Sequence, residues 1–294
     1  MDWNEVVTVL VAELGEPLRF DEALPVSGGD VNAAFDLRCG STKFFAKLNS
    51  PDKLAMFEQE SAQLKRLKGA CSLRVPRPYV TGKVGSHAYL VMEFVELGRV
   101  GEASAAGLGE GLAVLHQTTA DQYGWSSAGY LGLTRQLNER STSWCEFWRS
   151  QRLGFQQRLA LRNGLPAHIA VRLELLTDSL QSLLGDYHPP AALLHGDLWH
   201  ANCGADEEGT PVIFDPASYF GDPEADLAMT ELFGGFPESF YQAYWNIHPR
   251  AVEYEVRSQL YQLYHVLNHF NLFGGLYGNR AGTMVDLLLA EIGH

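Results

Sequence analysis

The sequence has 294 residues, 46% of them hydrophobic, so it can bury one large core or the cores of two lobes. Its formal net charge of −13 argues against a nucleic-acid partner or an anionic membrane surface, because both require a basic face. No run of about 18 apolar residues predicts a membrane span, and no secretory leader is visible. The four cysteines are too scattered for a disulfide framework or a zinc site. We therefore expect a reduced, cytoplasmic protein.

The N-terminal third of the chain predicts a small lobe rich in strands. A helix is expected over residues 3–14, where apolar residues recur at helical spacing. Strands are expected over residues 23–26 and 31–37, joined by a turn that contains Gly28 and Gly29. Glycines in such a turn either serve the geometry of a hairpin or allow backbone N–H groups to approach a phosphate.

The next strand carries a lysine that we predict to point inward. Residues 43–49 alternate as a strand, which places Lys47 beside an apolar side chain. In the helix expected to follow, Glu60 lies on the apolar stripe, whereas Glu58 faces another side. Because an inward carboxylate needs a charge partner, we predict that Glu60 pairs with Lys47. A lysine at the surface is the alternative.

Strands over residues 79–84 and 87–92 are expected to complete the first lobe. Beyond them the pattern changes to helices, so we divide the chain into an N-terminal nucleotide-binding lobe (residues 1–95) and a C-terminal catalytic lobe (residues 96–294). The glycine run at residues 107–111 follows no strand and continues a leucine repeat with helical spacing. We interpret it as a feature of helix packing rather than as a nucleotide loop.

The chemistry is concentrated in residues 195–202, HGDLWHAN, which we call the catalytic loop, and at Asp215. Each follows a short apolar segment that predicts a buried strand. Four residues separate Asp197 from Asn202, the spacing of the H-R-D-x-x-x-x-N loop of protein kinases. In those enzymes the aspartate accepts the proton of the attacking hydroxyl, and the asparagine and a later acid bind Mg²⁺. We predict Asp197 as the catalytic residue and Asn202 and Asp215 as metal ligands. A structural turn whose aspartates cap backbone N–H groups is the alternative.

A kinase-like catalytic loop also suggests a role for the first lobe. We predict that the N–H groups of Gly28 and Gly29 approach the phosphates of ATP, and that Lys47 binds the α- and β-phosphates. The sequence contains no G-x-x-x-x-G-K-[ST] motif, which excludes the P-loop kinases. The short segment at residues 217–221 leaves no room for a long activation segment, so we expect a constitutively active small-molecule kinase.

Two helices are expected to support the catalytic loop. One begins after Asp222 and Pro223, and carries Asp226 in its first turn. The other includes residues 259–273 and contains His265 and His269. We interpret these histidines as hydrogen-bonded polar residues rather than metal ligands, because no third ligand accompanies them.

Several runs of residues resemble the fructosamine kinase (ketosamine-3-kinase) family, a branch of the aminoglycoside phosphotransferase-like kinases. The longest are HGDLWHAN, VIFDPASYFGDPEADLAMTELFGGFP and LYQLYHVLNHFNLFGG. SGGDVNAAF, FFAKLN and MFEQESAQL extend the resemblance into the N-terminal half, so that it covers nearly the whole chain. HGD-x₄-N alone indicates only the kinase-like superfamily, whereas Trp199 and the segments 215–217 and 233–236 indicate this family. The resemblance implies an α+β, protein-kinase-like fold with a small β-sheet lobe and a larger, mostly helical lobe.

The resemblance also implies a reaction. The protein would use ATP and Mg²⁺ to phosphorylate the 3-hydroxyl of a ketosamine, and the unstable 3-phosphate would then release the amine, which is deglycation. Backbone groups of Glu93, Phe94 and Val95 would contact the adenine, and Trp199 and His200 would contact the sugar. The family usually has a small residue in place of His200, so a narrower pocket favours ribulosamine over fructosamine.

His195 and Asp226 would support this site. Asp226 resembles the buried helix acid that binds the backbone of the catalytic loop in kinase folds; a first-turn acid that interacts with the helix dipole is the alternative. Two other functions stay open: a kinase of the same superfamily that acts on an aminoglycoside, choline or a free sugar, and a nucleotide-binding pseudokinase. The sequence leaves the glycated amine and the oligomeric state open.

Overall fold

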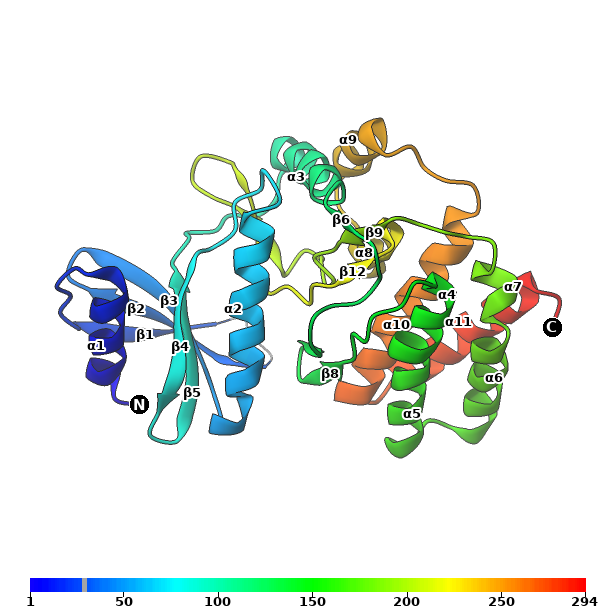
Figure 1. Cartoon of the computed structure of the whole chain (residues 1–294), viewed down its shortest axis with the longest axis horizontal. Helices are drawn as coiled ribbons and strands as arrows, with labels where there is room; N and C mark the ends of the chain where they lie inside the picture. The colour runs from blue at the N-terminus through cyan, green and yellow to red at the C-terminus, as the bar shows by residue number, and fades with distance from the viewer. Residues whose placement is uncertain (28–30) are drawn as a thin grey trace.

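The computed structural model describes residues 1–27 and 31–294, and it has two lobes that lie side by side (Figure 1). Within the described residues, the N-terminal lobe is an antiparallel sheet with strand order β1-β2-β3-β5-β4. The strands are β1 (Glu22–Val26), β2 (Ala33–Cys39), β3 (Thr42–Asn49), β4 (Pro78–Val84) and β5 (His87–Glu93). The helix α1 (Trp3–Leu14) covers one face, and α2 (Leu54–Lys68), which follows the 3-10 turn η1 (Pro51–Lys53), covers the other (Figure 1).

The central strands of this sheet are buried on both faces, because a helix covers each face. In β5, Tyr89 and Val91 belong to the apolar cluster on the α1 side, whereas Leu90 and Met92 belong to the cluster on the α2 side. Lys47 of β3 lies opposite Leu90 in the strand register, so its side chain points towards α2. This register places the predicted lysine between the sheet and the helix that carries the predicted glutamate.

The larger lobe is mainly helical. Its helices are α3 (Glu102–Leu115), α4 (Trp144–Phe147), the π-helix η2 (Trp148–Leu153), α5 (Gly154–Arg162), α6 (Ala167–Asp178), α7 (Leu180–Leu184), α8 (Pro223–Leu232), α9 (Glu238–Ile247), α10 (Tyr254–Phe273) and α11 (Tyr277–Glu291). Its short strands are β6 (Thr119–Ala120), β7 (Gly129–Leu131), β8 (Thr134–Gln136), β9 (Ala191–Leu193), β10 (Cys203–Ala205), β11 (Pro211–Ile213) and β12 (Phe220–Gly221). The small sheet lobe and the larger helical lobe match the α+β, two-lobed fold that the sequence predicts.

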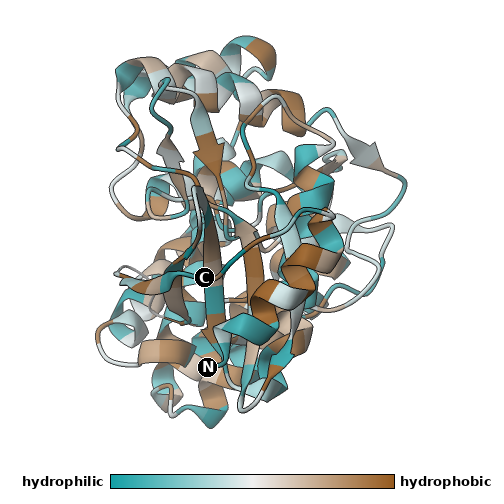
Figure 2. Ribbon diagram, turned by 90° about the vertical axis from the view of Figure 1, so that its left-hand side faces the viewer, coloured by the Kyte–Doolittle hydropathy of each residue, from teal (hydrophilic) through white to brown (hydrophobic). Residues whose placement is uncertain are grey.

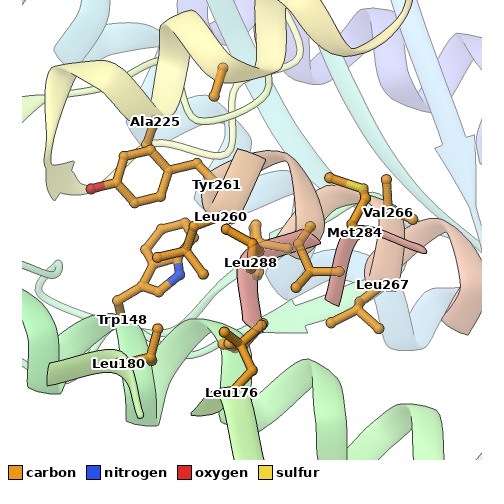
Figure 3. Packing of buried hydrophobic residues seen from close by; sticks show 14 of the residues in the cluster. Trp148, Leu176, Leu180, Ala225, Leu260, Tyr261, Val266, Leu267, Met284 and Leu288 are labelled. Carbon is orange, nitrogen blue, oxygen red and sulfur yellow. The ribbon is translucent and has the colours of Figure 1, made fainter. Parts of the chain in front are cut away.

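The core of the larger lobe is built around α10. Tyr261 of α10 packs edge-on against Trp148 with ring centroids 4.6 Å apart, and Leu288 of α11 lies beside Leu260 (Figure 3). Burial of such large apolar side chains stabilises the lobe by roughly 1.5–3 kcal/mol each. The packing fixes α10 in place beneath the catalytic loop.

The glycine run of the second lobe lies inside α3, as predicted. A Cβ atom on Gly109 would come within 2.1 Å of the carbonyl oxygen of Phe240 in α9. A Cβ atom on Gly111 would come within 2.2 Å of Cδ2 of Leu73. The glycines therefore allow α3 to approach its neighbours closely, which confirms their role in helix packing.

An apolar cluster joins the two lobes. It contains Leu64 and Leu90 from the N-terminal lobe together with Leu112 and Tyr244 from the helical lobe. The predicted boundary at residue 95 falls in the connection between β5 and α3. The position of this boundary stays a prediction.

The helices alternate teal and brown along their length, as expected of elements with one polar and one apolar side (Figure 2). The strands at the centre of the same view are largely brown, in agreement with their burial on both faces (Figure 2). Across the described ranges 1–27 and 31–294, no helix is both long and apolar enough to cross a membrane.

Candidate active site

Backbone hydrogen bonds tie the catalytic loop to the segment around Asp215. β9 leads into the loop and β11 leads into Asp215. The N–H of Ala217 donates to the carbonyl of His195 (2.9 Å), and the N–H of Phe214 donates to the carbonyl of Asn202 (3.0 Å). The two segments therefore form one hydrogen-bonded floor.

Gly196 is required at the closest point between these segments. Its φ of 83° lies in the left-handed region, and a Cβ atom would come within 2.2 Å of the carbonyl oxygen of Ala217. The N–H of Gly196 (2.7 Å) and the N–H of His195 (2.7 Å) both donate to the carboxylate of Asp226 in α8. Asp226 thus holds the start of the catalytic loop.

The groups around Asp226 keep its carboxylate ionised. Burial alone would raise its pKa, but His116 (Nε2, 3.2 Å), His195 and the Gly196 amide together lower the pKa of Asp226 below its usual value. His116 also bonds to the hydroxyl of Tyr244 through Nδ1 (2.8 Å). Two buried polar groups therefore fix the histidine that supports Asp226.

The ring of His195 bridges the two segments. Burial lowers the pKa of His195, so the ring is neutral. In that state Nε2–H donates to the carbonyl of Phe214 (3.0 Å), and Nδ1 accepts the N–H of Asp197 (3.3 Å). His195 thereby fixes the backbone of Asp197 relative to the strand that precedes Asp215.

The carboxylate of Asp197 is held by Asn202. Nδ2 of Asn202 donates to the carbonyl (2.9 Å) and to Oδ2 (3.0 Å) of Asp197. Burial, followed by the negative charge of Asp215, raises the pKa of Asp197 to about 7. A carboxylate with such a pKa is suited to accept a proton near neutral pH.

Lys47 forms ion pairs with one carboxylate of each lobe. Its Nζ lies 2.6 Å from Oε1 of Glu60 in α2 and forms a second ion pair with Asp215. Glu58, by contrast, is exposed, so the structure contains the predicted pair of Lys47 with Glu60. The contact between Lys47 and Asp215 was not predicted. Burial would lower the pKa of Lys47, but the charges of Asp215 and Glu60 outweigh it and raise this pKa.

One ammonium is thus shared by two carboxylates. Burial raises the pKa of Glu60 and Asp215 raises it further, while Lys47 opposes both effects. Asp215 itself has a φ of 55°, which a residue other than glycine rarely adopts. Such strain is typical of functional positions.

Asn202 and Asp215 fit a magnesium ion that is shared with a nucleotide. The amide nitrogen of Asn202 donates to Asp197, so its Oδ1 is the atom of this side chain that could bind a cation. Among the described residues, no group of three or more His, Cys, Asp or Glu could hold a metal ion. Mg²⁺ in nucleotide sites is usually held by one or two protein carboxylates together with phosphates and water, a donor set with which Asn202 and Asp215 are compatible.

Of the residues expected to contact the adenine, Glu93 already uses its backbone N–H within the protein. The N–H of Glu93 donates to the carbonyl of Arg77 (2.8 Å), and its carboxylate binds Arg74 (2.7 Å). The N–H of Glu93 therefore cannot serve the adenine. Phe94 and Val95 take part in no backbone hydrogen bond within the described chain. Gly28 and Gly29 lie outside the described residues.

The two residues predicted to contact the sugar differ in their placement. Trp199 is partly buried and packs against Phe233, with ring centroids 5.2 Å apart. His200 is exposed and contacts the edge of Trp199 (4.8 Å between centroids). The ring of Trp199 is therefore fixed by packing, whereas His200 is open to solvent.

Sequence reasoning missed residues that reach the site from other elements. The hydrogen bond of Gln63 to the carbonyl of Ser218 (3.2 Å) and that of Gln136 to the carbonyl of Ala217 (2.9 Å) hold the segment that follows Asp215. His265 lies 3.8 Å from Asp197, measured from Nδ1 to Oδ1. The helix carries several other polar residues, so the sequence alone did not single out His265 as a neighbour of Asp197.

The two lobes, the pair of Lys47 with Glu60, and the arrangement of Asp197, Asn202 and Asp215 define a phosphotransferase of the protein-kinase-like class. The chain belongs to the fructosamine kinase family, whose model matches residues 2–291.

Similar proteins extend over nearly the whole chain. A probable ketoamine kinase of Synechocystis sp. is 43% identical over 98% of this chain and 97% of its own. The chloroplastic protein-ribulosamine 3-kinase of Arabidopsis thaliana is 37% identical over 92% of this chain and 84% of its own. The crystal structure of a Haemophilus somnus protein described as a fructosamine-3-kinase superposes with a TM-score of 0.91, with 28% identity and coverage of 98% and 97% of the two chains.

Proposed function

We propose that this protein transfers the γ-phosphoryl group of ATP to the 3-hydroxyl of a ketosamine, with a ribulosamine as the preferred acceptor. The main support is the carboxylate of Asp197, held by Asn202 next to the ion pair of Lys47 with Asp215. This arrangement occurs in a chain that is similar over most of its length to ketoamine kinases and ribulosamine 3-kinases.

Asp197 acts on the acceptor. Its carboxylate accepts the proton of the 3-hydroxyl while the bond from that oxygen to the γ-phosphorus forms and the bond from the γ-phosphorus to ADP breaks. Its backbone is fixed by His195 and its side chain by Asn202, so little reorganisation is needed at the moment of transfer. Most of the rate then comes from positioning and electrostatics.

Lys47 acts on the nucleotide. It binds phosphate oxygens while Glu60 holds its Nζ, and Phe94 and Val95 offer backbone groups to the adenine. Asn202 and Asp215 would hold Mg²⁺, and the ion would supply positive charge to the phosphates.

Trp199 acts as an apolar wall for the sugar, and His200 narrows the rim. The product, a ketosamine 3-phosphate, is unstable and releases the amine, so the reaction serves deglycation. The acidic protein suits an acceptor that carries an amine, because opposite charges attract.

The test is phosphoryl transfer from Mg-ATP to ribulose-lysine, fructose-lysine, free ribulose and kanamycin. We expect turnover of both ketosamines, with the higher kcat/KM for ribulose-lysine, and phosphorus NMR should place the phosphate on the 3-hydroxyl. The variant Asp197→Asn serves as the control for contaminating kinases. If the protein turned over kanamycin or free ribulose but neither ketosamine, the kinase mechanism would stand and the ketosamine would be rejected as the acceptor.

A further inference from the structure

A histidine of α10 lies directly beside the catalytic carboxylate. Nδ1 of His265 is 3.8 Å from Oδ1 of Asp197, and the side chain of His265 is only 6% exposed. Nδ1 is buried and has no hydrogen-bond partner in the part of the chain that the structure describes. The sequence-based interpretation of His265 as a hydrogen-bonded residue is therefore wrong for this atom. Few buried nitrogens in folded proteins lack a partner, because such an atom loses its hydrogen bond to water on folding, so its position calls for an explanation.

The distance narrows the possible partners of Nδ1. A separation of 3.8 Å exceeds that of an N–H···O hydrogen bond, which is about 2.7–3.2 Å, and it leaves no room for a water molecule between the two atoms. Because Nδ1 is buried, an acceptor molecule cannot reach it while Asp197 stays in place. A shift of about 1 Å would complete the hydrogen bond to Oδ1, and catalytic hydrogen bonds are often long until substrates bind.

The rest of His265 is well anchored. Its carbonyl accepts a hydrogen bond from His269 (2.9 Å), and its ring packs edge-on against Tyr264 with centroids 5.1 Å apart. The hydroxyl of Tyr264 donates to Gln136 (3.0 Å), which in turn holds the segment after Asp215. Burial, together with His269 and Arg152, lowers the pKa of His265 to about 3. The ring is therefore neutral and carries one N–H.

We propose that His265 is a positioning residue for phosphoryl transfer: its Nδ1–H donates to Oδ1 of Asp197 when the acceptor is bound. Asn202 donates to Oδ2 of the same carboxylate, so a neutral donor holds each oxygen. Each carboxylate oxygen keeps a lone pair, one of which accepts the hydroxyl proton. His265 acts through Asp197 and does not touch the substrate. The proposal rests on the phosphoryl transfer proposed above, but not on the identity of the acceptor.

The test compares two amides at the same position. In His265→Asn the amide nitrogen lies two bonds from Cβ, as Nδ1 does, whereas in His265→Gln it lies one bond further along. We expect His265→Asn to keep kcat within about threefold of the wild type. We expect His265→Gln to lower kcat about 10- to 100-fold, because a displacement of the Asp197 carboxylate by about 1 Å has an effect of this size. The KM for Mg-ATP should change less than about twofold in both, because binding energy on the nucleotide side is untouched.

The same substitutions in the Asp197→Asn background separate positioning from packing. If His265 acts through the Asp197 carboxylate, His265→Gln should lower the kcat of Asp197→Asn by less than about a further twofold. The effects of substitutions at residues that act as a unit are not additive. A packing role would give the same factor in both backgrounds. The proposal is overturned by that result, or by His265→Asn losing as much activity as His265→Gln.

The outcome is independent of the acceptor. If the wild type acts only on an acceptor other than a ketosamine, the proposed function fails, but the ratio of the rates of His265→Asn and His265→Gln on that acceptor still decides the role of His265. Thermal unfolding of each variant identifies any loss that comes from misfolding, and the Asn and Gln variants introduce the same amide group, which makes them matched controls.

Discussion

The two sides of the site hold their carboxylates in different ways. On the nucleotide side, Glu60 and Asp215 share the ammonium of Lys47, and the three residues come from both lobes. On the acceptor side, Asp197 is held by the neutral amide of Asn202, within one lobe. The ion pair of Lys47 with Asp215 crosses between the lobes and so depends on the distance between them, whereas the hydrogen bond of Asn202 to Asp197 lies within one loop. In the proposed reaction Glu60 and Asp215 hold the group that binds phosphate, whereas Asp197 accepts the hydroxyl proton. Substitution of either of the first two carboxylates should therefore change the KM for Mg-ATP, and substitution of Asp197 should change kcat.

The strongest test of this difference is Asp197→Asn. We expect kcat to fall about 10²–10⁴-fold, because the acceptor of the hydroxyl proton is lost. Steady-state kinetics should give a KM for Mg-ATP within about threefold of the wild type. Asp215→Asn is the counterpart, and calorimetry should show weaker binding of Mg-ATP for it. Wild-type turnover in Asp197→Asn would remove the assignment of Asp197 as the base.

Glu60→Gln tests the nucleotide side. It removes the charge of a carboxylate that lies 2.6 Å from Lys47, so we expect the KM for Mg-ATP to rise about tenfold, as for the loss of one charge-assisted hydrogen bond of about 1.5 kcal/mol. Glu58→Gln, two residues away on the exposed side of α2, is the matched control and should stay within about twofold. A larger effect from Glu58 would contradict the assigned pair.

The pH dependence tests the acceptor side. Burial and Asp215 raise the pKa of Asp197 to about 7, and only its deprotonated form can accept a proton. As the pH falls below about 7, kcat/KM for the acceptor should therefore decrease, approaching tenfold per pH unit. This decrease should be absent from the residual activity of Asp197→Asn. Its persistence there would assign the titration to another group.

The smallest effect is expected at the rim. His200 is exposed, so His200→Ala should lower the preference for ribulose-lysine over fructose-lysine by only about threefold. Trp199→Ala is the comparison, since it removes the ring that packs against Phe233 and should raise the KM of both acceptors. An unchanged preference in His200→Ala would mean that the rim does not select the sugar.

The sequence predicted those features of the site that depend on local spacing. The interval from Asp197 to Asn202 depends on one loop, and the choice of Glu60 over Glu58 depends on the period of one helix. The lobes and the strand that carries Lys47 followed from the change in hydrophobic pattern along the chain. Each of these inferences uses residues close together in the sequence.

The features that the sequence did not predict depend on contacts between distant segments. The ion pair of Lys47 with Asp215 joins residues 168 positions apart, and no pattern in either segment indicates it. His265 is one of several buried polar residues of α10, and only the packing of that helix brings it to Asp197. Glu93 was predicted to contact the adenine because it ends a strand. Its hydrogen bond with Arg74 instead depends on the path of the chain before β4.

The apolar cluster that joins the lobes has a consequence for any attempt to express them separately. The cluster contains Leu64 and Leu90 of the first lobe and Leu112 and Tyr244 of the second, all of them buried. A chain cut between residues 95 and 96 would leave each half with an uncovered apolar face, and such faces promote aggregation. We therefore expect neither half to fold autonomously, whereas the two halves produced together should reassemble into a single particle. The expected unit of cooperative folding is therefore the whole chain rather than either lobe.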